Sequence, residues 1–428
     1  MFIIYITIYN IIMYIAQPII WIRLLWRSRR SPSYRKCWLE RYGFYRRKSI
    51  QSDGIILHAV SLGETLAAIP LIRALQQRYP KITITLTAMT PTGIELARSK
   101  FSHNTHCSYL PYDLPGAMKR FINQVKPRLV IAMETELWPN LINILYQRKI
   151  PFIIANARLS YRSFTGYNRF SYFISLIMKR ITLIAAQNKE DASRFLKLGF
   201  KKNQLFITGN LKYDIEMNQD LLNKISFLKK NWIKKRQVWI ASSTHSGEEI
   251  LLLQAHKHLL TRFPNLLMIL APRHPERFIS VKNITEQAGL SYIMRSNGVA
   301  PSKETQVIIN DTIGELMLLY GVSDIAFIGG SLVKHGGHNP LEPAAHSIPL
   351  IMGPYTFNFN DICIKLCKSN GLITVTDTES LVKAVAMLLV NQQCRVNYGY
   401  RAIKVLQHNQ GALKQLLGLL DSYLLVQK

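Results

Sequence analysis

Short apolar runs alternate with helical patterns along most of this chain, and no other feature restricts the fold as strongly. From Gly54 onward each run is followed by a loop and then by a segment with helical periodicity, such as Glu64–Gln77 or Trp138–Arg148. Continuously apolar strands that alternate with helices form parallel sheets with both faces covered. The runs expected to be strands are Gly54–Val60, Ile82–Met89, Leu129–Met133, Phe152–Ala157, Leu183–Gln187, Leu205–Thr208, Val238–Ser242, Leu266–Ala271, Val307–Asn310, Ile325–Ile328, Pro349–Met352 and Leu372–Val375.

A polar, lysine-rich stretch from Asp214 to Arg236 interrupts this alternation and is expected to connect two domains through one helix. We therefore predict an α/β protein with two Rossmann-like αβα domains that face each other across a cleft. The predicted segments are an N-terminal membrane anchor with its basic flank (1–35), a first Rossmann-like domain (36–214), the linker (215–236), a second Rossmann-like domain (237–408) and a C-terminal helix that packs back on the first domain (409–428).

The first 22 residues contain no charged side chain, and a basic cluster follows them at Arg23, Arg27, Arg29, Arg30, Arg35 and Lys36. About 20 apolar residues suffice to cross a bilayer, and a basic flank after them predicts that the body of the protein stays in the cytoplasm. A cleaved signal peptide would have its charges first. The segment is expected to anchor the protein by spanning the membrane. Two alternatives are that it lies in the membrane interface, because Asn10, Gln17 and Pro18 interrupt the apolar run, and that it packs onto the body of the protein.

The net charge of +29 favours an anionic partner, which is a membrane surface, an acidic substrate or a nucleic acid. The basic residues are mostly dispersed and no nucleic-acid-binding motif accompanies them, so no nucleic acid is expected. The five cysteines lack disulfide or zinc spacing, which indicates a reducing compartment. His335 and His338 have i,i+3 spacing without a third ligand, so we interpret them as polar loop residues and expect no metal.

Two glycine-containing loops follow the run that ends at Ile328. The first is Gly329-Gly330-Ser331, and the second, His335 to Pro343, includes Gly336-Gly337 and leads into a predicted helix start. Glycines let backbone N–H groups approach an anion closely. Glu342, in the first turn of that helix, can accept two hydrogen bonds from a vicinal diol such as a ribose. A phosphate cradle beside a diol acceptor indicates a nucleotide-sugar site.

Three other segments of the second half follow strands. Arg273, after Pro272, is suited to bidentate phosphate binding. Ile313-Gly314-Glu315 is expected to begin a helix whose N–H groups meet a nucleobase or phosphate. Ser242 to His245 follows the first strand of this half.

Carboxylates follow two strands of the first half. Glu64 comes after the first strand, where it either complements a helix dipole or acts as a general base, as an inverting sugar transfer requires. Glu134 and Glu136 follow the third strand, and we expect Glu134 rather than Glu136 to face the site, because i and i+2 side chains do not share a helix face. Arg158 and Lys212 also follow strands; Arg158 either binds an anionic acceptor or pairs with one of the glutamates.

Five segments together resemble the 3-deoxy-D-manno-octulosonic acid (Kdo) transferases, and the resemblance covers nearly the whole chain. They are Ser61-Leu62-Gly63-Glu64, Glu134 to Asn140, Gly209-Asn210-Leu211-Lys212, Pro272 to Glu276, and Gly336 to Pro343. The resemblance implies a GT-B fold, CMP-Kdo as donor without a further cofactor, and the lipid A precursor as acceptor at the cytoplasmic face of the inner membrane. It also implies that Glu64 is the catalytic base and that Glu134 and Lys212 support the transition state. The residues implied to hold CMP are Pro272, Arg273, Ile313, Gly314, Glu315, Asn339, Pro340, Leu341 and Glu342.

Two alternatives remain beside this hypothesis. Another GT-B protein, such as a UDP-sugar transferase or an epimerase, would share the glycine loop and the glutamate after it. A basic, membrane-tethered binding protein without catalytic activity would use the positive charge alone, but it would not need Glu64 and Glu134 at strand ends.

Overall fold

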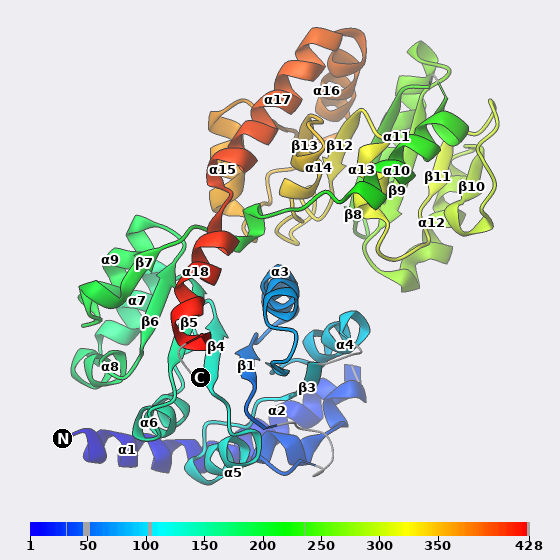
Figure 1. Ribbon diagram of the computed structural model, residues 1–428. Helices are drawn as coiled ribbons and strands as arrows, with labels where there is room; N and C mark the ends of the chain where they lie inside the picture. Colours follow the sequence, from blue (N-terminus) through cyan, green and yellow to red (C-terminus); the bar gives the residue numbers. More distant parts are fainter. Residues whose placement is uncertain (31, 46–51, 102–104, 235, 426–428) are drawn as a thin grey trace. The chain divides into compact units, whose positions relative to one another are not determined.

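The computed structural model describes residues 1–428 except 31, 46–51, 102–104, 235 and 426–428. The chain divides into two compact units (Figure 1). Unit 1 contains Met1–Asp214 and Gln410–Lys428, and unit 2 contains Ile215–Asn409. Each unit holds one parallel sheet, as the alternation of strands and helices predicts.

The sheet of unit 1 has seven parallel strands in the order β3-β2-β1-β4-β5-β6-β7. Their bounds are β1 Ile55–His58, β2 Ile84–Ala88, β3 Thr105–Tyr109, β4 Leu129–Met133, β5 Phe152–Ala157, β6 Leu183–Ala186 and β7 Leu205–Ile207. The sequence did not predict β3, because this edge strand carries His106, Cys107 and Ser108 instead of an apolar run. The other six strands lie within their predicted runs.

Helices cover both faces of this sheet, because alternate residues of each strand point to opposite sides. Ile55 and Leu57 of β1 pack with α3 and α18, and Ile56 packs with α5, α6, α8 and α9. The bounds are α3 Leu62–Arg78, α4 Pro91–Lys100, α5 Pro115–Val125, α6 Pro139–Gln147, α7 Tyr161–Asn168, α8 Ser171–Met178, α9 Lys189–Lys197 and α18 Ala412–Leu424.

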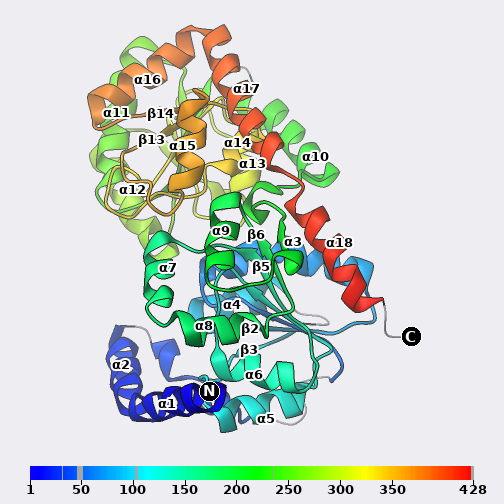
Figure 2. The ribbon, with the colours of Figure 1, turned by 90° about the vertical axis from the view of Figure 1, so that its left-hand side faces the viewer.

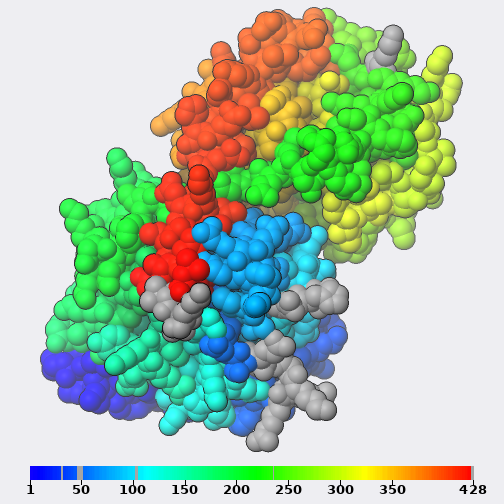
Figure 3. Space-filling view, viewed as in Figure 1, coloured from blue at the N-terminus to red at the C-terminus, as the bar shows by residue number. Residues whose placement is uncertain are grey.

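The C-terminal helix α18 lies beside α3, and Figure 3 shows the two side by side. Arg78 of α3 forms an ion pair with Asp421 of α18. Asp214 accepts hydrogen bonds from the backbone N–H groups of Gly411 and Leu413, both at 2.6 Å. Thus α18 completes the core of unit 1.

The N-terminal segment forms two helices, α1 (Phe2–Ile15) and α2 (Gln17–Arg30), which meet at a bend of 43°. Among the described residues no single helix has the length and apolar composition of a membrane span, and only this bent pair meets both requirements together. Polar residues of the pair contact the rest of unit 1. The Tyr9 hydroxyl donates to Asp113 at 3.0 Å, and Asn10 accepts from the Asn140 side chain at 2.7 Å. The polar residue Asn10 that interrupts the apolar run therefore binds the body of the protein.

The sheet of unit 2 has seven parallel strands in the order β10-β11-β9-β8-β12-β13-β14. Their bounds are β8 Val238–Thr244, β9 Leu267–Pro272, β10 Tyr292–Met294, β11 Val307–Ile309, β12 Ile325–Ile328, β13 Leu350–Met352 and β14 Leu372–Thr374. The sequence did not predict the three-residue edge strand β10, all of whose residues are only partly buried.

The helices of unit 2 are α10 Gln219–Leu228, α11 Glu248–Arg262, α12 Phe278–Gln287, α13 Leu316–Gly321, α14 Leu341–Ala345, α15 Asn360–Lys368, α16 Thr378–Val390 and α17 Gln392–Asn409. Helix α10 is the single helix predicted between the two halves. The expectation that a helix begins at Ile313 was wrong. Helix α13 begins at Leu316, because Gly314 has a positive φ of 88° that a right-handed helix does not accommodate.

Candidate active site

Strands β1 and β4 are neighbours at the centre of the first sheet, and the chain proceeds outward from them in both directions. In open α/β sheets ligands bind beyond the carboxyl ends of the strands at such a reversal of strand order. Glu64 follows β1, and Glu134 and Glu136 follow β4. The carboxylates singled out in the sequence therefore lie at the position where the fold favours a ligand.

Glu64 is fixed by hydrogen bonds to both carboxylate oxygens. Val60 donates its backbone N–H to Oε2 at 2.8 Å, and Ser61 donates its hydroxyl to Oε1 at 2.9 Å. Ser61 is also the N-cap of α3 and accepts from the N–H of Glu64. The helix-capping role considered for Glu64 is thus present, and it orients the side chain without removing the lone pairs a base needs.

The pKa of Glu64 is raised by burial, and the charge of Glu134 raises it further. The hydrogen bonds from Val60 and Ser61 and the charge of Lys212 act in the opposite direction. A carboxylate that must accept a proton near neutral pH works better with a raised pKa. Glu64, Glu134 and Lys212 therefore form one electrostatic group.

Glu136 belongs to the same group, so the expectation that Glu134 alone faces the site was wrong. Burial raises the pKa of Glu136 to about 8, with further contributions from the charges of Glu64 and Glu134. Trp138 donates its indole N–H to Glu136 at 2.6 Å. The helical spacing rule fails here because α6 begins only at Pro139, and Glu134 has a positive φ of 57°.

Lys212 is positioned by amide side chains from three strand ends. Asn156, the penultimate residue of β5, accepts from the N–H of Leu211 at 3.0 Å. Asn210 accepts from the N–H of Lys212 at 2.9 Å and donates to Gln187, which follows β6, at 3.0 Å. Isolated amides at strand ends are common, so the sequence did not distinguish this network. The positive φ of Asn156, 53°, marks it in the structure.

In unit 2 the corresponding reversal of strand order lies between β8 and β12. Here the buried carboxylate of Glu248, the first residue of α11, accepts four backbone hydrogen bonds. The donors are the N–H groups of His245, Gly330, Ser331 and Leu332, at 2.7 to 3.0 Å. The hypothesis that Gly329-Gly330-Ser331 cradles a phosphate was therefore wrong, because these donors already bind an anion of the chain itself. Gly329 is required for another reason: a Cβ there would lie 2.5 Å from the backbone oxygen of Ser243.

Glu342 lies in the first turn of α14, as predicted, and is half-buried. Asn339 donates its side-chain amide to Glu342 at 3.1 Å and accepts from the N–H of Leu341 at 3.1 Å. Burial raises the pKa of Glu342, and the charge of Arg273 opposes this shift. Arg273 follows Pro272, the last residue of β9. Because its charge acts on Glu342, Arg273 lies near the Asn339–Glu342 segment.

Four histidines gather around Arg273, which the sequence did not predict. The ring of His245 lies 4.2 Å from that of His335 and 5.4 Å from that of His274, measured between centroids. His245 and His338 share a hydrogen bond between their Nε2 atoms at 2.8 Å. Since one Nε2 must donate and the other accept, the hydrogen bond between the two rings contains one shared proton, and the accepting ring is neutral at that Nε2. No group of three or more His, Cys, Asp or Glu side chains in the described part of the chain is arranged to hold a metal ion.

The remaining predicted segment, Ile313 to Glu315, precedes α13 beyond the end of β11. The side chain of Ile313 is 81% exposed. Glu315 accepts from Arg295 at 3.0 Å and also from Thr312. These contacts hold the turn in place, while the Ile313 side chain stays outside the core of unit 2.

The sequence matches the family model described as 3-deoxy-D-manno-octulosonic-acid transferase (kdotransferase) over residues 36–215. It is 48% identical to the 3-deoxy-D-manno-octulosonic acid transferase of Haemophilus influenzae over 97% of this chain and 98% of that protein. It is 30% identical to the transferase of the same name from Bordetella pertussis, over 95% and 96% of the two chains. The chain belongs to the Kdo transferase family.

A Kdo transferase is a glycosyltransferase, so the reaction class expected from the sequence is confirmed and the hypothesis of a non-catalytic binding protein is wrong. The fold also resembles that of UDP-GlcNAc 2-epimerase from Neisseria meningitidis bound to UDP-GlcNAc, with a TM-score of 0.56 at 13% identity over 86% of this chain and 99% of the other. This likeness supports the predicted GT-B class of the two αβα units.

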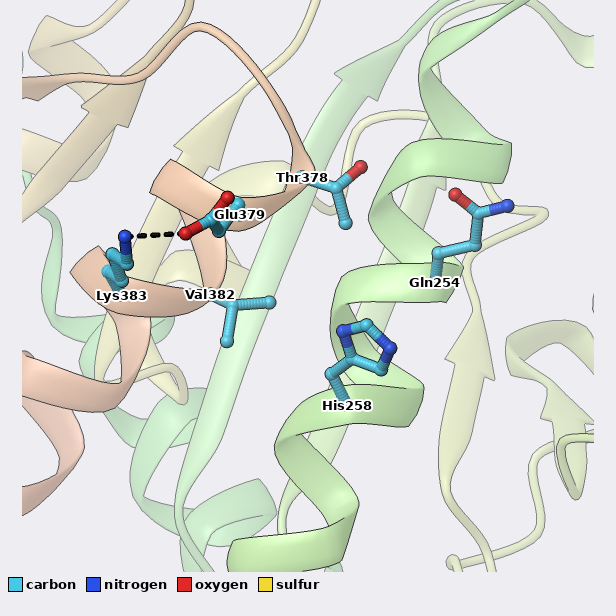
Figure 4. A pocket seen from close by; sticks show the side chains of 6 residues that line it. All are labelled: Gln254, His258, Thr378, Glu379, Val382 and Lys383. Atoms are coloured by element: carbon cyan, nitrogen blue, oxygen red, sulfur yellow. Dashed lines mark hydrogen bonds and ion pairs between the residues drawn. The ribbon is translucent and has the colours of Figure 1, made fainter.

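A surface pocket of this Kdo transferase lies elsewhere in unit 2, between α11 and α16 (Figure 4). It is lined by Gln254, His258, Thr378, Glu379, Val382 and Lys383. The charged groups in it, Glu379 and Lys383, pair with each other at 2.6 Å. None of the predicted site residues lines this pocket, which we assign no role in the reaction.

Proposed function

We propose that this Kdo transferase moves Kdo from CMP-Kdo to the lipid A precursor, lipid IVA, at the cytoplasmic face of the inner membrane during assembly of the lipopolysaccharide core. The observation that carries the proposal is the fixed carboxylate of Glu64, with its raised pKa, at the central reversal of strand order. An enzyme that activates a sugar hydroxyl needs such a base.

In the proposed reaction Glu64 takes the proton from the acceptor hydroxyl, and the hydroxyl oxygen forms a bond to the anomeric carbon of Kdo. The bond from that carbon to the phosphate oxygen of CMP breaks with inversion, and CMP leaves with the bonding electrons. Lys212 moderates the negative charge around Glu64. Glu134 faces the positive charge that develops on the sugar ring.

Unit 2 is proposed to bind CMP-Kdo. Arg273 has the planar guanidinium that binds phosphate in bidentate fashion and stabilises charge on the leaving CMP. Glu342, oriented by Asn339, accepts the ribose hydroxyls, and Pro340 and Leu341 fix its backbone. The exposed turn of Ile313, Gly314 and Glu315 receives the base. In this proposal Arg273 stabilises the charge on the leaving group, so the transfer needs no metal or further cofactor.

The N-terminal helices are proposed to hold the enzyme in the membrane interface rather than to cross the bilayer. Two observations support this: side chains of α1 contact the rest of unit 1, and many apolar side chains of the pair are exposed. A helix pair with one side docked on the protein and apolar side chains exposed on the other can lie in the plane of the interface. The exposed isoleucines are Ile3, Ile4, Ile8, Ile11, Ile12, Ile15, Ile19 and Ile22.

The test is to incubate the full-length protein in detergent micelles with CMP-Kdo and a tetraacyl lipid A precursor, and to determine the masses and anomeric configuration of the products. The proposal predicts that the acceptor gains Kdo and that the configuration at the anomeric carbon inverts. Retention of configuration would contradict the single displacement, and transfer from a UDP-sugar instead of CMP-Kdo would contradict the donor.

A further inference from the structure

Helix α7 (Tyr161–Asn168) buries none of its residues, which is unusual for a helix at the edge of a core. Large apolar side chains in α7 and in the residues after it are exposed, with Tyr161 at 70%, Phe170 at 68% and Tyr172 at 49%. Exposed apolar groups that cluster rather than scatter indicate a binding surface. We call α7, Phe170 and α8 (Ser171–Met178) the α7–α8 surface.

The chain around this surface carries positive charge only. Between Glu136 and Glu190 the sequence contains no aspartate or glutamate and eight basic residues: Arg148, Lys149, Arg158, Arg162, Arg169, Lys179, Arg180 and Lys189. Arg162 and Arg169 are seven residues apart and therefore share one side of the helical segment. Both are exposed. This side of α7 attracts anions.

Gly166 lies between the two arginines on the same side, four residues after Arg162. A Cβ added at Gly166 would meet no atom within 4 Å. The space at Gly166, between Arg162 and Arg169 in the sequence, is therefore open. A bulky anionic group can approach both arginines without displacing any side chain of the protein.

One end of the surface lies at the carboxylate group of the candidate active site. Helix α7 follows the carboxyl end of β5 after only Arg158, Leu159 and Ser160. The pKa of Tyr167 in α7 is raised by burial and by the charge of Glu136, so this tyrosine lies near that carboxylate. The arginines of α7 are thus on the helix that adjoins the proposed catalytic carboxylates.

The other end of the surface contacts the N-terminal helix. The ring of Tyr172 lies 5.6 Å from that of Tyr5, and the ring of Phe173 lies 6.3 Å from that of Phe2. Arg180 stacks over the ring of Phe2 at 3.5 Å. Figure 2 shows α7 leading into α8, and α8 next to α1. The basic, aromatic surface therefore contacts α1, the helix that also carries exposed isoleucines.

We propose that the α7–α8 surface binds the phosphorylated headgroup of the glycolipid acceptor while its acyl chains stay in the membrane. The proposal rests on the function proposed above, and it assigns the phosphate contacts to Arg162 and Arg169 and the apolar contacts to Tyr161, Phe170 and Tyr172. A phosphorylated glycolipid combines the negative charge, the bulk and the apolar chains that the surface matches. A nucleic acid would match the charge but not the contact with α1, a helix whose isoleucines are exposed.

The test compares three variants of the full-length enzyme. R162E/R169E reverses both charges, and Gly166→Leu fills the open space without touching the core. K201E/K202E, the matched control, reverses two exposed lysines before β7, at the opposite, amino edge of the sheet. The apparent KM for the lipid A precursor is expected to rise at least tenfold in R162E/R169E and severalfold in Gly166→Leu. The KM of the control variant for the lipid A precursor is expected to equal that of the wild type. For all three variants, the Kd for CMP-Kdo by calorimetry and the binding to vesicles of anionic phospholipid are expected to remain unchanged.

The outcomes separate this proposal from the proposed function. If the wild-type enzyme transfers Kdo but neither variant changes the KM for the acceptor, the docking surface is wrong and the function stands. If the wild type transfers no Kdo to the precursor, the function itself is wrong. An equal rise in the control would attribute the effect to net charge and overturn the proposal. The proposal would also be overturned if R162E/R169E lost RNA binding but transferred Kdo as the wild type does, because the surface would then bind nucleic acid. A precursor lacking its phosphates should bind R162E/R169E and the wild type alike.

Discussion

The hydroxyl of Ser61 donates a hydrogen bond to Oε1 of Glu64 at 2.9 Å and accepts one from the N–H of the same residue. One serine thus caps α3 and orients the proposed catalytic base.

Ser61→Ala should therefore lower both stability and turnover. Loss of an N-cap reduces the free energy of unfolding by about 1 kcal/mol, and loss of the contact to Glu64 should reduce kcat about fivefold to tenfold with little change in the KM for CMP-Kdo. Asn218→Ala is the control, because Asn218 caps α10 by accepting from Leu221 at 2.9 Å and does not contact a carboxylate. Turnover lowered equally in both variants would show that the effect arises from stability alone.

Glu248→Gln should destabilise unit 2 strongly. The carboxylate of Glu248 accepts four backbone hydrogen bonds, and an amide would direct its own NH2 group at some of those donors. Leaving buried donors unsatisfied costs roughly 1–3 kcal/mol each, so we expect a loss of about 3 kcal/mol in denaturant unfolding. Glu379→Gln removes an exposed ion pair of the same unit and should change stability by less than about 1 kcal/mol. If Glu248→Gln is as stable as the wild type, the hydrogen bonds from the glycine loop to the Glu248 carboxylate do not stabilise unit 2.

The histidine pair should make stability depend on pH. Burial, together with the charge of Arg273 and the neighbouring imidazoles, lowers the pKa of His245 to about 4 and that of His338 to about 3. Arg277 also acts on His245, and His274 and His335 act on both. The unfolded pKa is near 6.5, so the folded state resists protonation. Stability is complete above about pH 6.5 and is lost as the pH falls toward 4.

His338→Gln should reduce this pH dependence, because Gln does not titrate and can still donate to or accept from His245. The measurement is the Tm of both proteins between pH 7.5 and 4.5. Other buried histidines, such as His58 and His256, contribute equally to both curves. Parallel curves would show that the shared proton has no part in stability.

Glu342→Ala should raise the apparent KM for CMP-Kdo by roughly 10- to 100-fold, since hydrogen bonds to a charged group contribute about 1.5–3 kcal/mol. The KM for the lipid acceptor should remain near that of the wild type in steady-state assays. An effect confined to the lipid acceptor would contradict the assignment of Glu342 to the ribose.

Much of the fold was predictable from the sequence because its strands are apolar on both faces. The runs at β4, β5 and β12 match the structure residue for residue, since buried central strands of parallel sheets contain few polar residues. The edge strand β3 was missed because it carries polar residues and pairs on one side only, and β10 was missed as well.

The positions of the candidate site residues were predictable where they depend on a place after a strand. Their contacts were not predictable where the partner lies far along the chain. Glu64, Glu134 and Arg273 lie after strands, as the sequence predicts, and their roles in the reaction stay predictions. The loop Gly329-Gly330-Ser331 was predicted to bind a phosphate but binds the Glu248 carboxylate instead. Glu248 lies 82 residues before Gly330 in the sequence, so this contact could not be predicted. The N–H···N bond between His245 and His338 joins residues 93 apart. Spacing in the sequence carries no signal for such contacts.

The measurement that tests the central claim most directly is single-turnover transfer by Glu64→Gln, with the Kd for CMP-Kdo determined on the same preparation. Gln keeps the size of the side chain and can accept from Ser61 or Val60, but it cannot take a proton. We expect transfer to fall by at least 1,000-fold (a loss on the scale of general-base catalysis), with an unchanged Kd for CMP-Kdo and an unchanged Tm. Transfer within about tenfold of the wild-type rate would contradict the assignment of Glu64 as the base.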